Sequence, residues 1–126
     1  MAGEAEKIVS DVQAKWAAAF SKLDAEALST LYSKHAFLYG SNPNLYRGKD
    51  GTKAYFSSLP RWQSQSVKFT EITTETVGTE IVSMAGTANF VFDKQALTVK
   101  ITWVIVREDD AWKILSHHVS SKAPLL

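Results

Sequence analysis

The chain has 126 residues, of which 45% are hydrophobic, so it is long and apolar enough to form one domain with a core over residues 1–126. Its 14 basic and 13 acidic residues give a net charge of +1 and form no basic stripe, which argues against a nucleic-acid partner. The absence of cysteine excludes disulfides, thiolate metal ligands and cysteine nucleophiles, and no apolar run approaches the ~18 residues of a membrane span.

The N-terminal half reads as helical. Residues 1–7 have no basic stretch followed by an apolar run, so we expect no signal peptide and take the cytoplasm as the default location. Apolar residues then recur at spacings of three and four, which predicts a helix over residues 4–23. Asp24 can cap a second helix that carries Leu28, Leu31 and Tyr32 and ends near residues 33–34.

The rest of the chain reads mainly as strands. Residues 36–39 predict a short strand, residues 40–44 a loop, and residues 50–59 a short helix that ends before Pro60. Four long alternating runs follow at residues 67–77, 81–92, 97–107 and 111–121, separated by turn sequences. This order predicts an α+β fold, a cone in which three helices pack on a strongly curved antiparallel sheet.

The strand over residues 111–121 carries the main functional signal. Regular alternation would place Trp112, Ile114, Ser116, His118 and Ser120 on one face, which is apolar at one end and polar at the other. Such a face suits a sheet that is packed at one end and lines a cavity at the other. We therefore expect His118 to face the cavity and His117 to face the opposite side.

Aromatic and polar residues could converge around that cavity. Tyrosine hydroxyls could donate to a ligand carbonyl, and His118 could serve as a hydrogen-bonding or proton-transfer group. No metal site is expected, because adjacent residues of a strand point to opposite faces and His117 and His118 therefore cannot bind one ion. No cofactor and no inward-facing carboxylate is predicted. The candidate pocket residues are Tyr39, Tyr46, Trp62, Phe90, Trp103, His118 and Ser120.

Three segments together resemble the SnoaL-like group of the nuclear transport factor 2-like superfamily. They begin at Asp24, at Arg47-Gly48 and at Trp112, and the last, Trp-Lys-Ile-Leu-Ser-His-His-Val-Ser, is the most specific. The resemblance implies a cone-shaped fold that is usually dimeric through its sheet, and a family of cyclases, isomerases, dehydratases, epoxide hydrolases and non-catalytic assembly domains. Within it, His118 and Ser120 match pocket positions at the strand end. Trp103 falls where the calcium/calmodulin-dependent kinase II association domain carries a pocket arginine, and the family's catalytic carboxylates have no match.

Three functions remain open at this point. The first is binding of a small apolar or aromatic molecule that carries a carbonyl, the second is isomerase or cyclase chemistry by His and Tyr, and the third is a non-catalytic dimerising domain. A homodimer is expected through the sheet, because the face opposite the cavity is too apolar to stay wholly in water. That face is expected to hold Thr98, Lys100, Thr102, Val104, Val106, Leu115, His117 and Val119.

Overall fold

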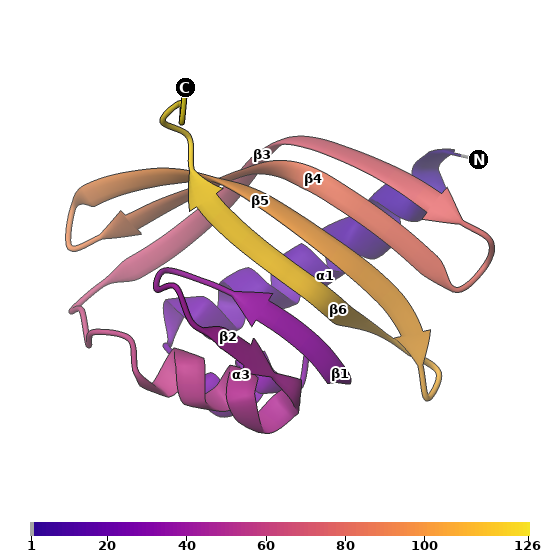
Figure 1. Ribbon diagram of the computed structural model, residues 1–126, viewed down its shortest axis with the longest axis horizontal. Coiled ribbons are helices and arrows are strands. Elements are labelled where there is room, and N and C mark those ends of the chain that lie inside the picture. Colours follow the sequence, from indigo (N-terminus) through magenta and orange to yellow (C-terminus); the bar gives the residue numbers. More distant parts are fainter. Residues whose placement is uncertain (1) are drawn as a thin grey trace.

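Three helices pack against a six-stranded sheet in the computed structural model, which describes residues 2–126 (Figure 1). The helices are α1 (Ala2–Ser21), α2 (Ala25–Ser29) and α3 (Gly48–Ser57). The strands are β1 (Tyr32–Tyr39), β2 (Leu45–Arg47), β3 (Gln65–Val77), β4 (Ile81–Phe92), β5 (Gln95–Glu108) and β6 (Ala111–Ser121). The predicted α+β fold is confirmed.

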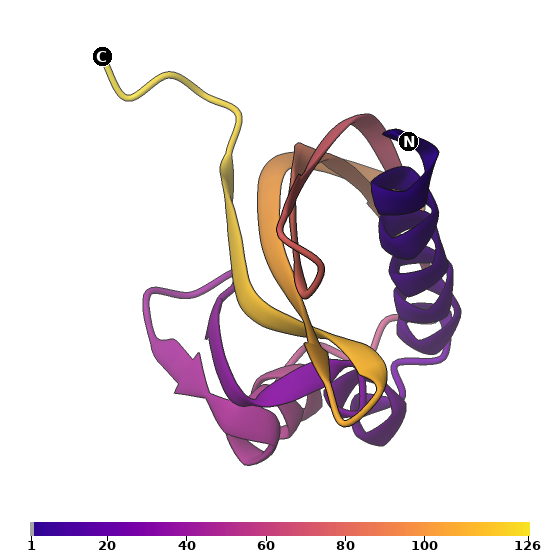
Figure 2. The same ribbon diagram turned by 90° about the vertical axis from the view of Figure 1, so that its right-hand side faces the viewer.

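The sheet has the order β2-β1-β6-β5-β4-β3. Strands β3 to β6 form the predicted antiparallel meander, whereas β1 joins β6 in parallel and carries β2 at the edge. The sheet curls, and α1 lies along its inner side (Figure 2). None of the described helices is both long and apolar enough to cross a membrane.

The second helix is shorter than its sequence pattern predicts. Asp24 caps α2 as expected, with its carboxylate 3.0 Å from the Ala27 backbone nitrogen. The helix stops at Ser29, however, and Tyr32 belongs to β1, where it is opposite Ile114 of β6. Pairing with a strand far along the chain thus overrides local helical periodicity. Strand β2, with only three residues, was not predicted.

Two strands contain bulges that change which side chains point inward. In β3 the register shifts between Thr70 and Thr73, and Glu71 there has a φ of 55°. In β6, Ile114 pairs with Ile105 and Ser116 pairs with Val104, so Leu115 is an extra residue. The bulge at Leu115 reverses the predicted facing of every residue that follows it in β6.

The core lies between α1 and the inner face of the sheet. Trp16 and Phe20 of α1 are buried there with Trp103 of β5, and Tyr32 and Ile114 are fully buried where β1 meets β6. The end of β4, the start of β5 and the end of β6 extend beyond this packed region. The cavity described below lies between these strand ends and the helices.

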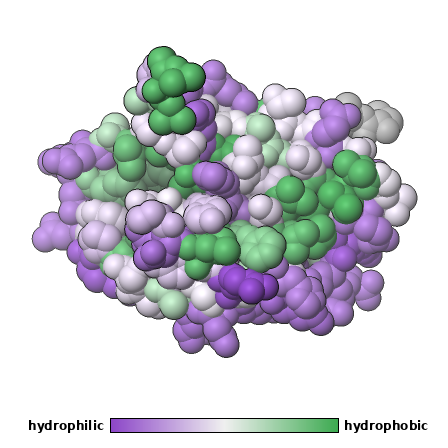
Figure 3. Space-filling view, in the orientation of Figure 1, coloured by the Kyte–Doolittle hydropathy of each residue, from purple (hydrophilic) through white to green (hydrophobic). Residues whose placement is uncertain are grey.

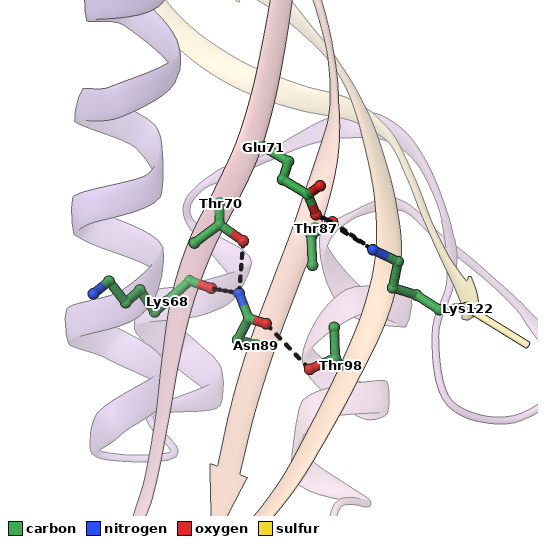
Figure 4. Close-up of polar contacts among 7 residues, drawn as sticks. All are labelled: Lys68, Thr70, Glu71, Thr87, Asn89, Thr98 and Lys122. Carbon is green, nitrogen blue, oxygen red and sulfur yellow. Dashed lines mark hydrogen bonds and ion pairs between the residues drawn. The ribbon is translucent and has the colours of Figure 1, made fainter.

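Polar side chains tie the outer face of β3, β4 and β5 together (Figure 4). The Asn89 amide donates to the Thr70 hydroxyl at 2.8 Å and accepts from the Thr98 hydroxyl at 3.1 Å. Glu71, at the β3 bulge, accepts from Thr87 at 2.8 Å and from the Lys122 ammonium at 3.3 Å. These contacts fix the segment after β6 against the outer face.

Candidate functional site

A cavity of about 590 Å³ lies between α1, the segments that follow β1 and α3, and the adjoining ends of β4, β5 and β6. Its volume is in the range of small-molecule sites. Aromatic rings form a large part of its lining, and Leu59, Leu97, Val99 and Val119 add aliphatic surface. The aromatic residues are Trp16, Phe20, Tyr55, Phe56, Trp62, Phe90 and Phe92.

His117 is the buried polar group of this cavity. Its side chain is only 4% exposed, and its ring lies 6.4 Å from that of Trp16 and 6.2 Å from that of Trp103. His117 points inward because Leu115 is an extra residue in β6, so that Ile114, His117 and Val119 share the inner face. The expectation that His118 faces the cavity and His117 the outside is therefore wrong.

A chain of hydrogen bonds holds the His117 ring in place. Its Nδ1 lies 2.8 Å from the Tyr32 hydroxyl and 3.0 Å from Nε1 of Trp103. The Tyr32 oxygen in turn accepts a hydrogen bond of 3.0 Å from Nε1 of Trp16. Tyr32 of β1 and Trp103 of β5 thus meet at one imidazole nitrogen of β6, and Trp16 of α1 supports Tyr32, which fixes the orientation of the ring.

Burial keeps both ionisable members of this chain neutral. Burial, with a smaller electrostatic effect of neighbouring His118, lowers the pKa of His117 to about 3. Burial also raises the pKa of the Tyr32 phenol, an effect that the Trp16 hydrogen bond opposes only in part. At neutral pH the site therefore contains an uncharged imidazole and an intact phenol.

Comparison with known proteins identifies the family of the chain. The family model of the SnoaL-like domain matches residues 9–124. The chain belongs to the SnoaL-like family. No curated protein sequence matches it.

Solved structures share the fold of this SnoaL-like domain at low sequence identity. A candidate calcium/calmodulin-dependent protein kinase II association domain from Xanthomonas campestris has a TM-score of 0.83 and 18% identity, covering 94% of this chain and 87% of that one. A nuclear transport factor 2-like protein of unknown function from Pseudomonas putida has a TM-score of 0.83 and 14% identity, with 99% and 92% covered. A candidate dehydratase of the same fold family from Streptomyces avermitilis has a TM-score of 0.80 and 16% identity, with 98% and 100% covered.

Only some of the predicted pocket residues lie at the cavity of the SnoaL-like domain. Trp62 and Phe90 line it, and Ser120 borders it at the exposed end of β6. Trp103 is fully buried beneath it and reaches it through His117. Tyr46 packs behind the wall, with its ring 5.1 Å from that of Tyr55.

The remaining two predicted residues lie on the other side of the sheet. Tyr39 and His118 are exposed neighbours on the outer face, with ring centroids 5.4 Å apart. They are opposite each other in the parallel pairing of β1 with β6, so both point away from the core. Their assignment to the pocket is therefore corrected, and the same bulge explains the error for His118.

A polar pair at the cavity, Tyr55 and Ser41, was not predicted from the sequence. The Tyr55 hydroxyl donates to Ser41 Oγ at 3.0 Å and accepts from the Ser41 backbone N–H at 2.9 Å. Gly40 permits this arrangement, because a Cβ at this position would overlap the Tyr55 ring. The sequence predicts the helix that carries Tyr55, but nothing local indicates that the loop after β1 reaches the Tyr55 ring.

The charges available to the site limit its chemistry. No Asp, Glu, Lys or Arg side chain is among the cavity-lining residues of the described chain. Across residues 2–126 there is also no group of three His, Cys, Asp or Glu residues placed to hold a metal ion. The arrangement suits recognition of an uncharged molecule, with one histidine and a few hydroxyls as its polar contacts.

Proposed function

We propose that this SnoaL-like domain binds a small apolar or aromatic molecule that carries a carbonyl group. The observation that supports this most directly is an aromatic-walled cavity of about 590 Å³ with a buried, neutral His117 on its wall. The rings would bury the apolar body of the ligand, and His117 would face its carbonyl. Apolar lining with a few placed polar groups is typical of small-molecule sites.

An isomerase or cyclase reaction has weaker support than binding. Proton abstraction is most efficient when the pKa of the base lies near the working pH. The pKa of His117 lies well below neutrality, and no carboxylate lines the cavity among the described residues. The neutral imidazole could polarise a carbonyl, but the base that would complete such a reaction has no candidate here.

Filling the cavity tests this function. We expect 1-aminoanthracene, a neutral aromatic fluorophore, to bind the wild-type protein with a rise in fluorescence. Val119 lines the cavity, so Val119→Trp should weaken binding by about tenfold or more by occupying the ligand's space. Val77→Trp is the matched control, because Val77 lies in β3 and is 58% exposed. Equal titration curves for the two variants would refute binding in this cavity.

We also propose that two copies associate through the outer face of the sheet. Phe37, Tyr39 and Leu45 are 45%, 41% and 43% exposed on this face, next to the half-buried Val104 and Val106. Figure 3 shows apolar side chains gathered across it. An apolar surface of this kind is typical of a contact surface. The residues on this outer face differ from those expected from the sequence. His117 and Val119 point inward, whereas Ser116 and His118 point outward.

Light scattering at micromolar concentration tests this association. We expect a mass of twice 13.9 kDa for the wild-type chain. Val104→Glu should shift the protein toward the monomer, because an unpaired carboxylate would be buried at the contact. Ser10→Glu serves as a control, because it adds a carboxylate to the exposed surface of α1, away from the outer face of the sheet. A wild-type protein that remains a monomer at this concentration would rule out the proposed contact.

A further inference from the structure

The hydrogen bonds around His117 determine which of its nitrogens carries the proton. A tryptophan Nε1–H can only donate, and Nε1 of Trp103 lies 3.0 Å from Nδ1 of His117. Nδ1 must therefore be an acceptor, because a proton on it would face the Trp103 proton. In a neutral imidazole the proton then resides on Nε2.

The second contact to Nδ1 is consistent with this assignment. The Tyr32 oxygen already accepts the hydrogen bond from Trp16, so its own proton is free to point toward Nδ1 at 2.8 Å. Tyr32 and Trp103 then both donate to Nδ1 and share its single lone pair. A proton on Nδ1 would point at the Trp103 proton and break that contact inside the core, where an unpaired donor is costly.

The other nitrogen of the ring is available to a ligand. Within the described chain, Nε2 makes no hydrogen bond, and it is not among the polar atoms that are sealed in the core without a partner. His117 is only 4% exposed and lines the cavity, so a ligand in the cavity is the natural partner for its Nε2–H. The cavity therefore contains a donor of fixed direction that needs an acceptor.

We infer that the hydrogen-bond chain of Trp16, Tyr32 and Trp103 locks His117 as a donor, so that the cavity selects neutral ligands whose acceptor group meets Nε2. This inference rests on the proposed binding function and specifies its ligand class as ketones, aldehydes, esters or amides. A carboxylate ligand is disfavoured, because it would lose its hydration shell on entering the cavity. No cationic side chain among the described cavity residues would compensate for that loss. An apolar analogue is disfavoured because it would leave Nε2–H unpaired. Trp16, Tyr32 and Trp103 act as positioning residues.

Three naphthalenes of similar shape test the ligand class by displacement of 1-aminoanthracene. We expect 2-acetylnaphthalene to bind about tenfold or more tightly than 2-isopropylnaphthalene, in which a methyl group replaces the carbonyl oxygen, and more tightly than 2-naphthoate. His117→Phe should remove the preference for the ketone while retaining the isopropyl compound. Equal affinity of the wild-type protein for all three refutes the inference and leaves apolar binding intact. Binding of none of them refutes the proposed function and the inference with it.

The proton position is measured independently of any ligand. Long-range proton–nitrogen NMR spectra of ¹⁵N-labelled protein distinguish the two neutral tautomers and the charged ring. We expect His117 to be the Nε2–H tautomer from about pH 5 to 8. Tyr32→Phe and Trp103→Phe should each shift the signature toward a mixture of tautomers, a change that mere loss of packing would not produce. His118→Ala should leave the signature unchanged. A proton on Nδ1 in the wild-type protein overturns the assignment.

Discussion

Replacement of Trp16 by alanine should lower the free energy of unfolding by about 3–5 kcal/mol. The Trp16 ring is 2% exposed, stacks on Phe20 at 5.0 Å and meets the edges of Phe56, Phe69 and Phe90. Its loss would leave a cavity in the centre of the core and remove the donor to Tyr32. Urea unfolding followed by circular dichroism measures the change.

Trp112→Ala is the matched comparison for this experiment. Regular alternation places Trp112 on the inner face, but Trp112 is only half-buried and is in none of the ring pairs described for Trp16. We therefore expect the smaller loss from Trp112→Ala. Equal destabilisation of the two variants would contradict the placement of Trp16 at the centre of the core.

The stability of the protein should fall by about 1.5–2 kcal/mol between pH 6.5 and pH 5 because of His117. The unfolded chain has a histidine pKa of about 6.5 and takes up a proton in this range, whereas folded His117, with a pKa of about 3, does not. Protons therefore favour the unfolded chain, and the stability contributed by neutral His117 is lost as the pH falls. Chemical unfolding at a series of pH values measures the slope.

Carboxylates contribute little in this window. Hydrogen bonds from Thr87 and Ser33 lower the pKa values of Glu71 and Glu108, so the stability that these groups add is lost at lower pH. His117→Phe should flatten the slope above pH 5, and His118→Phe should change it less, since His118 is exposed. If His117→Phe does not fold, the ring signals of wild-type His117 answer the same question. A His117 that titrates near pH 6.5 in the folded protein would contradict its burial as a neutral base.

The long elements were predictable from the sequence because their periodicity reflects burial. The α1 helix and the strands β3 to β6 lie where the apolar spacing places them, within a few residues. The position of Tyr32 was not predictable in this way. It continues the helical pattern of α2, yet its backbone joins β6 and its hydroxyl binds a residue 85 positions later. Local spacing carries no information about such a partner.

The candidate site was less predictable than the fold, because a single bulge decides it. Trp62 and Phe90 could be assigned to the cavity from their position on the elements around it. The choice between His117 and His118 depends on Leu115, which no turn residue or glycine marks in the sequence. The sequence pattern of β6 is equally compatible with a regularly alternating strand and with a bulged one.

The parallel pairing of β1 with β6 also has a consequence for how the protein is made. Until β6 has left the ribosome, the edge of β1 that pairs with β6 is unpaired, and the Tyr32 hydroxyl lacks its partner His117. The helices and β1 therefore cannot complete their fold until the β5–β6 hairpin has emerged. Contacts over such separations slow folding and prolong the exposure of strand edges. The period between the synthesis of β1 and that of β6 is the time when this chain is most vulnerable to aggregation and proteolysis.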